Sequence, residues 1–203
     1  MLNQSFNIDK SELNKTLDNG GVIAFVTDTV WGLGCLPNNK KGIDKIYEIK
    51  GRDRTKPLIL MSDEVQNLYP YVENLSNNAK ALINQYFPGA LTVIAEKSEK
   101  TSFDVTSGKN TVGIRVPDNK FFKELCKAIE SHVLATTSAN LSNNPSSKSY
   151  EEAKQSIGSY VDILYEDFGY KCKGLESTVV LATDSDIKIL RQGSINLDNY
   201  GNI

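Results

Sequence analysis

The chain of 203 residues is poor in cysteine and histidine, with three Cys and one His. Cys35, Cys126 and Cys172 are far apart and form no C-x-x-C pair, so the sequence offers neither a disulfide framework nor a zinc site. No apolar run approaches the ~20 residues that span a bilayer. Residues 1–10 lack a charged start followed by an apolar segment, which argues against a signal peptide. We therefore expect a cytoplasmic protein without membrane contact.

Motifs of several large enzyme classes are also missing. The chain contains no G-x-x-x-x-G-K-S/T loop, which excludes a P-loop nucleotidase. Gly32-Leu33-Gly34 begins like a dinucleotide-binding fingerprint, but Pro37 stands in the place of the third glycine, so a Rossmann site is disfavoured. Because His132 is the only histidine, a hydrolase triad or a catalytic zinc would depend on that one residue.

What the chain does have is a local cluster of positive charge. The net charge is −2 and the pI is about 5.5, so bulk charge does not demand a nucleic-acid partner. Residues 50–56 nevertheless place four cations within seven residues and run directly into 57–61, an apolar segment typical of a buried strand. Since such a strand would hold the loop while Arg and Lys supply donors, the segment indicates an anion-binding loop. A charged surface loop is the alternative.

The spacing of apolar residues predicts helices that alternate with strands early in the chain and a tail that is mostly strand. Helices are expected near residues 10–19, 40–50, 79–86, 122–129 and 150–157. Strands are expected near residues 22–26, 57–61, 91–95, 111–116, 133–136, 161–165, 178–182 and 187–190, with a polar loop between 95 and 111. This order predicts an α/β fold, a single domain over residues 1–203 with an open, twisted, mixed β-sheet and packed helices.

Polar clusters fall at the ends of five predicted strands. They are residues 27–29, Arg115, residues 136–140, residues 176–178 and Arg191. Each cluster alone is explained as an ordinary turn or surface residue, but ligands of open α/β sheets bind where strand ends present loops. These clusters supply hydroxyls, an amide and cations but no nucleophile–base pair. Such groups favour binding of a polyanion and an amino acid over covalent catalysis. The chemistry would then be positioning and charge stabilisation at a phosphorus centre.

At this point the sequence resembles a known family, the YrdC/TsaC threonylcarbamoyl-AMP synthases. The matching segments are residues 27–34 (TDTVWGLG), 46–52 (IYEIKGR) with 56–58 (KPL), 87–92 (FPGALT), 112–117 (VGIRVP), 138–142 (SANLS), 176–180 (ESTVV) and 189–193 (ILRQG). They follow the family order over nearly the whole chain. Trp31 stands where the family usually has Tyr, and Val26 where it usually has Pro. The resemblance is to the short form without an extra C-terminal domain.

The resemblance implies a YrdC-like fold and a defined reaction. L-threonine, bicarbonate and ATP, with Mg²⁺, would give threonylcarbamoyl-adenylate and pyrophosphate. The product would supply threonylcarbamoyladenosine beside the anticodon of tRNA, through downstream tRNA threonylcarbamoyl-transfer proteins, and direct tRNA contact is a further implied interaction.

The resemblance also implies roles for individual residues. The catalytic, phosphate-facing cations would be Lys50, Arg52 and Lys56. The threonine contacts would be Thr29, Met61, Arg115 and Ser177. The ATP contacts would be Arg52, Lys56, Thr111, Thr136, Ser138, Asn140, Ser146 and Arg191, with Ser138 and Asn140 on the Mg²⁺ side. Residues 142–149 are a candidate lid over the nucleotide.

Three other functions are compatible with parts of the sequence. A non-catalytic module of the same fold that binds double-stranded RNA or tRNA would use residues 50–56, but the pI of about 5.5 disfavours it. A carbamoyl-transfer domain of the hydrogenase-maturation type would come with zinc-finger and acylphosphatase-like parts, which the chain lacks. The third is an α/β protein that binds some other nucleotide.

Overall fold

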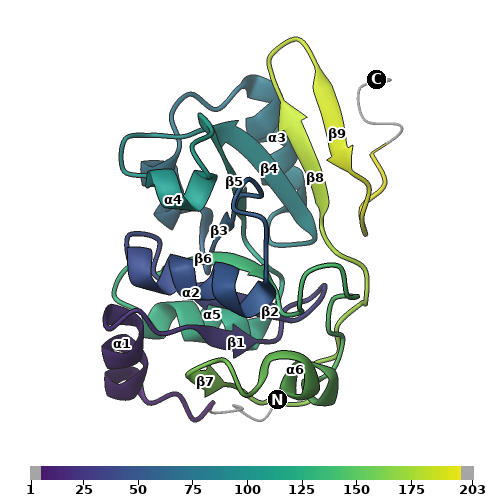
Figure 1. Cartoon of the computed structure of the whole chain (residues 1–203). Coiled ribbons are helices and arrows are strands. Elements are labelled where there is room, and N and C mark those ends of the chain that lie inside the picture. The colour runs from purple at the N-terminus through teal and green to yellow at the C-terminus, as the bar shows by residue number, and fades with distance from the viewer. Residues whose placement is uncertain (1–5, 198–203) are drawn as a thin grey trace.

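One mixed sheet organises the part of the chain that the computed structural model describes, residues 6–197 (Figure 1). Within those residues nine strands lie in the order β7-β1-β2-β6-β3-β5-β4-β8-β9. They are β1 (Ile23–Phe25), β2 (Gly32–Cys35), β3 (Ile59–Ser62), β4 (Leu91–Glu96), β5 (Thr111–Arg115), β6 (Val133–Ser138), β7 (Ile163–Leu164), β8 (Thr178–Ala182) and β9 (Ile187–Arg191). The predicted α/β class with an open, mixed sheet is confirmed.

Six α-helices and two short 3-10 turns surround the sheet in the described residues. They are α1 (Lys10–Asp18), α2 (Lys40–Lys50), η1 (Val65–Asn67), η2 (Tyr69–Tyr71), α3 (Asn77–Tyr86), α4 (Phe103–Thr106), α5 (Lys120–Ala128) and α6 (Tyr150–Ile157). Helix α2 packs on β2, and α3 packs on β4 and β8 (Figure 1). Gly51 ends α2 in the left-handed conformation, with φ 55°, which glycine adopts without steric cost. None of these helices is long and apolar enough to cross a membrane.

Strand pairing brings the polar strand ends together. The central strand β3 pairs in parallel with β5, which places Met61 opposite Arg115. On its other side β3 pairs antiparallel with β6, and Ile59 lies opposite Thr136. Segments more than fifty residues apart in the chain therefore meet around β3.

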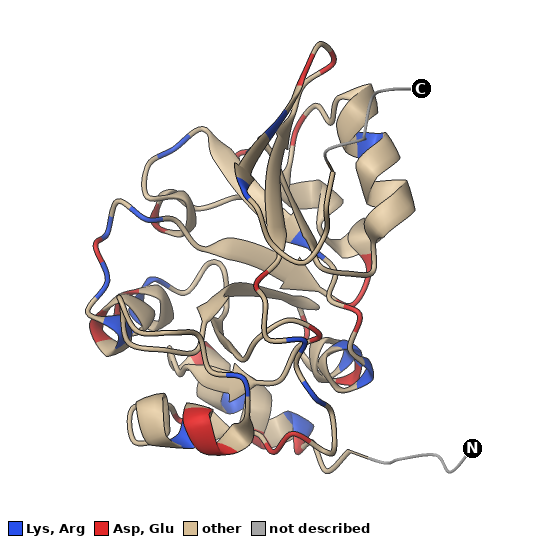
Figure 2. Ribbon diagram, turned by 90° about the vertical axis from the view of Figure 1, so that its right-hand side faces the viewer, with Lys and Arg blue, Asp and Glu red and all other residues tan. Residues whose placement is uncertain are grey.

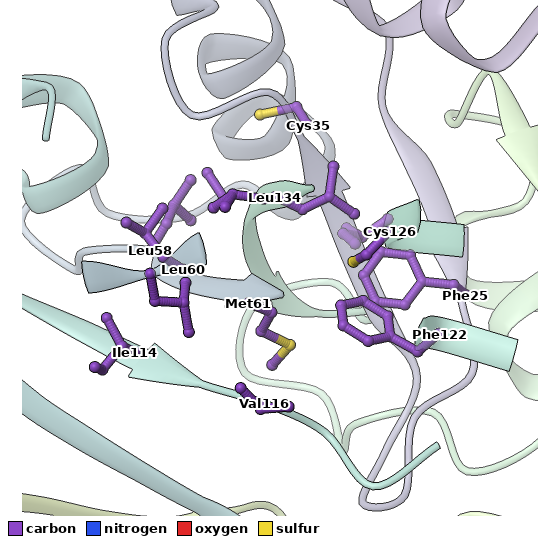
Figure 3. Close-up of a cluster of buried hydrophobic side chains, with 14 of the residues drawn as sticks. Phe25, Cys35, Leu58, Leu60, Met61, Ile114, Val116, Phe122, Cys126 and Leu134 are labelled. Atoms are coloured by element: carbon purple, nitrogen blue, oxygen red, sulfur yellow. The ribbon is translucent and has the colours of Figure 1, made fainter. Parts of the chain in front are cut away.

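The buried side chains form one continuous core, part of which Figure 3 shows. Phe25 of β1 and Phe122 of α5 pack with their ring centroids 5.1 Å apart. Phe25 also explains the glycines of β2, because a Cβ on Gly32 or Gly34 would come within 2.7 Å or 2.9 Å of its ring. These glycines therefore serve packing in a strand, and the disfavoured dinucleotide interpretation is not needed.

Most predicted elements are confirmed to within a few residues, and three expectations change. Strand β2 was not predicted, since Gly32-Leu33-Gly34 carries little apolar signal. The predicted polar loop contains the short helix α4, which is capped by Ser102, whose side chain accepts a hydrogen bond from the backbone N–H of Val105. Strand β6 extends two residues beyond its expected end at Thr136, to Ser138, because pairing with β2 continues through Thr137 and Ser138.

Candidate active site

A cleft of about 310 Å³ opens where β2, β3, β5 and β6 meet the loop after α2. Most residues predicted for the site line it. They are Thr29, Lys50, Arg52, Lys56, Met61, Arg115, Thr136, Ser138, Asn140 and Arg191. The structure thus gathers predicted threonine, phosphate and nucleotide contacts around one space.

Ser177 and Ser146 lie at the border of the cleft. The Ser177 hydroxyl is 2.8 Å from the hydroxyl of Thr92 and accepts from Nη2 of Arg191 at 3.2 Å. The Ser146 hydroxyl donates to Oε1 of Glu176 at 2.6 Å. Both serines therefore touch residues of the cleft wall without lining the space themselves.

Thr111 does not join this group, which corrects its predicted nucleotide contact. It begins β5 opposite Glu96, whereas Arg115 ends the same strand. Four residues of strand span roughly 13 Å, and Thr111 lines a different cavity beside the start of α3. The prediction came from the family resemblance, and the residue sits at the end of β5 that lies away from the cleft.

The basic loop after α2 divides into residues that face the cleft and one that does not. Arg52 lines the cleft and is held by the backbone oxygens of Lys56 and Pro57, at 3.2 Å and 3.3 Å. Arg54 instead makes an ion pair with Asp44 on the outer side of α2. Elsewhere positive and negative residues are interspersed over the elements (Figure 2), so the concentration of cations at the cleft is a local feature.

Lys50 is buried beneath the cleft, with 2% of its surface exposed. Its ammonium donates to the backbone oxygens of Ser138 and Asn140 at 2.6 Å and 2.7 Å, and to Oδ1 of Asn140 at 3.0 Å. An ammonium has three N–H donors, and all three are used. Lys50 therefore positions residues 138–140, and its predicted direct contact with phosphate is corrected to this positioning role.

The same contacts correct the expected Mg²⁺ side. Oδ1 of Asn140 accepts from Lys50 and, at 2.6 Å, from the Ser138 hydroxyl. The ammonium of Lys50 thus binds the oxygens of Ser138 and Asn140 that we expected to face the metal. Ser138 and Asn140 therefore do not fit Mg²⁺ in this arrangement. Burial, and next the charge of Arg52, lower the pKa of Lys50 to about 7.

Arg115 is the buried cation of the cleft, with 2% of its surface exposed. Its guanidinium donates to the Gly89 oxygen and the Thr29 hydroxyl, both at 2.9 Å, and makes an ion pair with Oδ1 of Asp28. Burial lowers the pKa of Arg115, and Asp28 acts in the opposite direction. Oδ2 of Asp28 is buried without a hydrogen-bond partner among residues 6–197.

Asp28 and Glu176 are site residues that the sequence analysis did not assign. Both stood in the polar clusters, at residues 27–29 and 176–178, but only as neighbours of the assigned hydroxyls. Glu176 lines the cleft and makes an ion pair with Nη1 of Arg191. Arg191 also donates from Nε and Nη2 to the backbone oxygen of Ser177, at 3.1 Å and 2.9 Å.

The fold and cleft define an α/β protein with one mixed sheet and a cation-lined cleft at its centre. The family model Sua5/YciO/YrdC, described as telomere recombination, matches residues 15–193. A threonylcarbamoyl-AMP synthase of Thiobacillus denitrificans is 32% identical over 180 residues, covering 88% of this chain and 93% of the relative. One of Bacillus subtilis is 37% identical over 176 residues, covering 86% and 50%.

Two solved structures resemble the fold. Pyrococcus abyssi Sua5 complexed with L-threonine has a TM-score of 0.87 at 26% identity, and the match covers 97% of this chain and 58% of that one. Escherichia coli YciO has a TM-score of 0.82 at 24% identity, with 96% and 95% covered. The chain belongs to the Sua5/YciO/YrdC family.

Proposed function

We propose that the protein is an L-threonylcarbamoyladenylate synthase, which makes threonylcarbamoyl-AMP and pyrophosphate from L-threonine, bicarbonate and ATP. One observation carries the proposal. A buried Arg115–Thr29 pair and the cations Arg52, Lys56 and Arg191 line the same cleft of about 310 Å³. An amino-acid subsite next to a polyanion subsite is what this reaction needs.

At the amino-acid end, Arg115 receives the threonine carboxylate. A guanidinium has five N–H donors, and three of them are used by Gly89, Thr29 and Asp28. One N–H on each Nη remains, which is the arrangement that a bidentate carboxylate contact requires. Met61, opposite Arg115 in the sheet, contributes an apolar wall.

At the phosphate end, Arg52, Lys56 and Arg191 stabilise the charge that develops on ATP. The threonine nitrogen bonds to the bicarbonate carbon with loss of water. A carbamate oxygen then bonds to the α-phosphorus as the bond to the β-phosphate oxygen breaks. Negative charge grows on the leaving pyrophosphate, where fixed cations lower the barrier. Mg²⁺ carried with ATP supplies further charge neutralisation when bound.

The reaction requires no covalent intermediate with the protein, and the thiols fit that mechanism. Burial raises the pKa of Cys172 to about 11 and also raises the pKa of Cys35 and of Cys126. A cysteine is nucleophilic as the thiolate, and the raised pKa values keep all three cysteines in the thiol form near neutral pH.

Further parts of the proposal concern the cell. We place the protein in the cytoplasm as one YrdC-like domain over residues 1–203. Its adenylate product passes to tRNA threonylcarbamoyl-transfer proteins, which modify the adenosine beside the anticodon. Contact with tRNA belongs to the same proposal. A non-catalytic RNA-binding module would need a basic face, and Figure 2 shows charges of both signs interspersed over the elements.

Amino-acid selectivity tests the proposed pocket. We expect threonine to bind in calorimetric titration, and serine to bind about 1–3 kcal/mol more weakly because it lacks one methyl group. Valine should lose at least as much, since it leaves the partners of the hydroxyl unpaired. Arg115→Lys should weaken all three, because the bidentate contact disappears, with its melting curve as the folding control. Equal affinity for the three amino acids in the wild type would reject this pocket.

A further inference from the structure

Glu176 has an unusual place in the cleft. Of the residues that line it in the described part of the chain, Glu176 alone carries a carboxylate. Lys50 and Arg52 line the same cleft, so their positive charges stand in the space that this carboxylate faces. A negative group therefore stands where the proposed function requires negatively charged phosphates to bind.

The two oxygens of Glu176 occupy donors that a phosphate would use. Oε1 accepts from the Ser146 hydroxyl at 2.6 Å, and Oε2 is paired with Nη1 of Arg191. Ser146 belongs to the 142–149 loop and Arg191 ends β9, so the carboxylate connects two segments at the rim of the cleft. Carboxylate and phosphate oxygens compete for the same hydroxyl and guanidinium donors.

The carboxylate is accessible enough to change partner. About a third of the Glu176 side chain, 34%, is exposed, and Arg191 is exposed to 46%. Metal-free ATP would have to displace a like-charged group from Arg191. Mg²⁺ is held in proteins by one or two carboxylates together with substrate phosphates, so a metal-bound triphosphate would offer Glu176 a new partner.

We propose that Glu176 makes nucleotide binding depend on a divalent cation. Its carboxylate leaves Arg191 and Ser146 for the cation that accompanies the triphosphate, and thereby frees both donors for the phosphates. The inference rests on the proposed use of ATP and adds a metal-facing role to a residue that is not among the predicted substrate contacts. It also supplies the hard oxygen ligand that Ser138 and Asn140 do not, because Lys50 occupies them.

Calorimetric titration of ATP into the protein, once with excess Mg²⁺ and once with EDTA, tests this role without measuring turnover. In the wild type we expect ATP to bind at least about tenfold more tightly with Mg²⁺. Glu176→Gln keeps the shape and removes the charge, so metal-free ATP should bind about tenfold more tightly than to the wild type. The ratio between the two conditions should then fall to about three or less. Glu151→Gln, an exposed site on α6 outside the cleft, should leave the ratio unchanged.

Glu176→Asp keeps the charge and should retain most of the Mg²⁺ dependence, which separates charge from the structural link to Ser146. A Glu176→Gln protein with the wild-type ratio would overturn the inference and leave the proposed function standing. So would a wild type whose ATP affinity is equal in Mg²⁺ and EDTA. If Glu176→Gln fails to fold, loss of the metal dependence in Glu176→Asp overturns the inference and its retention supports it. A wild type that binds no ATP in either condition would overturn the inference and the proposed function together.

Discussion

Replacing Arg52 with alanine is expected to lower turnover about 30- to 1,000-fold, which corresponds to ~2–4 kcal/mol of lost transition-state stabilisation. Arg52 lines the cleft and is fixed by the backbone oxygens of Lys56 and Pro57, so its charge is already in place when ATP arrives. Pre-positioned charge in a partly enclosed site is the largest contribution that these residues can make. Steady-state pyrophosphate release measures the effect.

Arg54→Ala is the matched control for this variant. Arg54 lies two residues away in the same basic loop, but it pairs with Asp44 and is not among the residues of the cleft. It should keep turnover within about threefold of the wild type, since an exposed ion pair contributes little to the stability of the fold. Arg52→Ala that folds normally and turns over like Arg54→Ala would show that the phosphates bind elsewhere.

Asp28→Ala is expected to lower the free energy of unfolding by about 3–5 kcal/mol, because it leaves a buried arginine charge unpaired. Asp28 and Arg115 are 7% and 2% exposed, so water cannot replace the lost partner. Total stabilities of domains are about 5–15 kcal/mol, and the variant should unfold at much lower urea concentration. Urea denaturation followed by circular dichroism measures the change.

A second variant separates the charge from the space that Asp28 fills. Asp28→Ala combined with Arg115→Met removes both charges, and it should recover part of the stability lost in Asp28→Ala, as neutral replacements of buried pairs do. A loss below about 1 kcal/mol in Asp28→Ala would mean that the ion pair does not anchor Arg115, and the proposed carboxylate contact would lose its structural basis.

The sequence predicted the site better than it predicted the contacts within the site. Polar residues at strand ends, such as Thr29 and Arg115, were expected to converge because an open sheet presents its loops at strand ends. Thr111 was assigned from the family resemblance and not from this reasoning, and only the pairing of β5 with β3 and β4 shows that it lies at the other end of the strand from Arg115. Strand β2 was missed because its glycines are explained only by the ring of Phe25.

Partners far apart in the chain explain what the sequence could not show. In the sequence Lys50 is one of four cations in a short basic segment. In the structure its ammonium donates to the backbone oxygens of Ser138 and Asn140, which lie 88 and 90 positions further along the chain. That pairing converts a presumed phosphate contact into a positioning residue. Glu176 read as a neighbour of Ser177, and only its contacts with Ser146 and Arg191 reveal a carboxylate inside a basic cleft.

Product formation from the complete set of substrates tests the central claim most directly. Purified protein is given ATP, Mg²⁺, L-threonine and bicarbonate, and each is left out in turn, while pyrophosphate is quantified and the adenylate is identified by mass. We predict pyrophosphate and threonylcarbamoyl-AMP in equal amounts, formed only when ATP, threonine and bicarbonate are all present. Pyrophosphate release at an undiminished rate without threonine, or without any threonylcarbamoyl-AMP, would contradict the account.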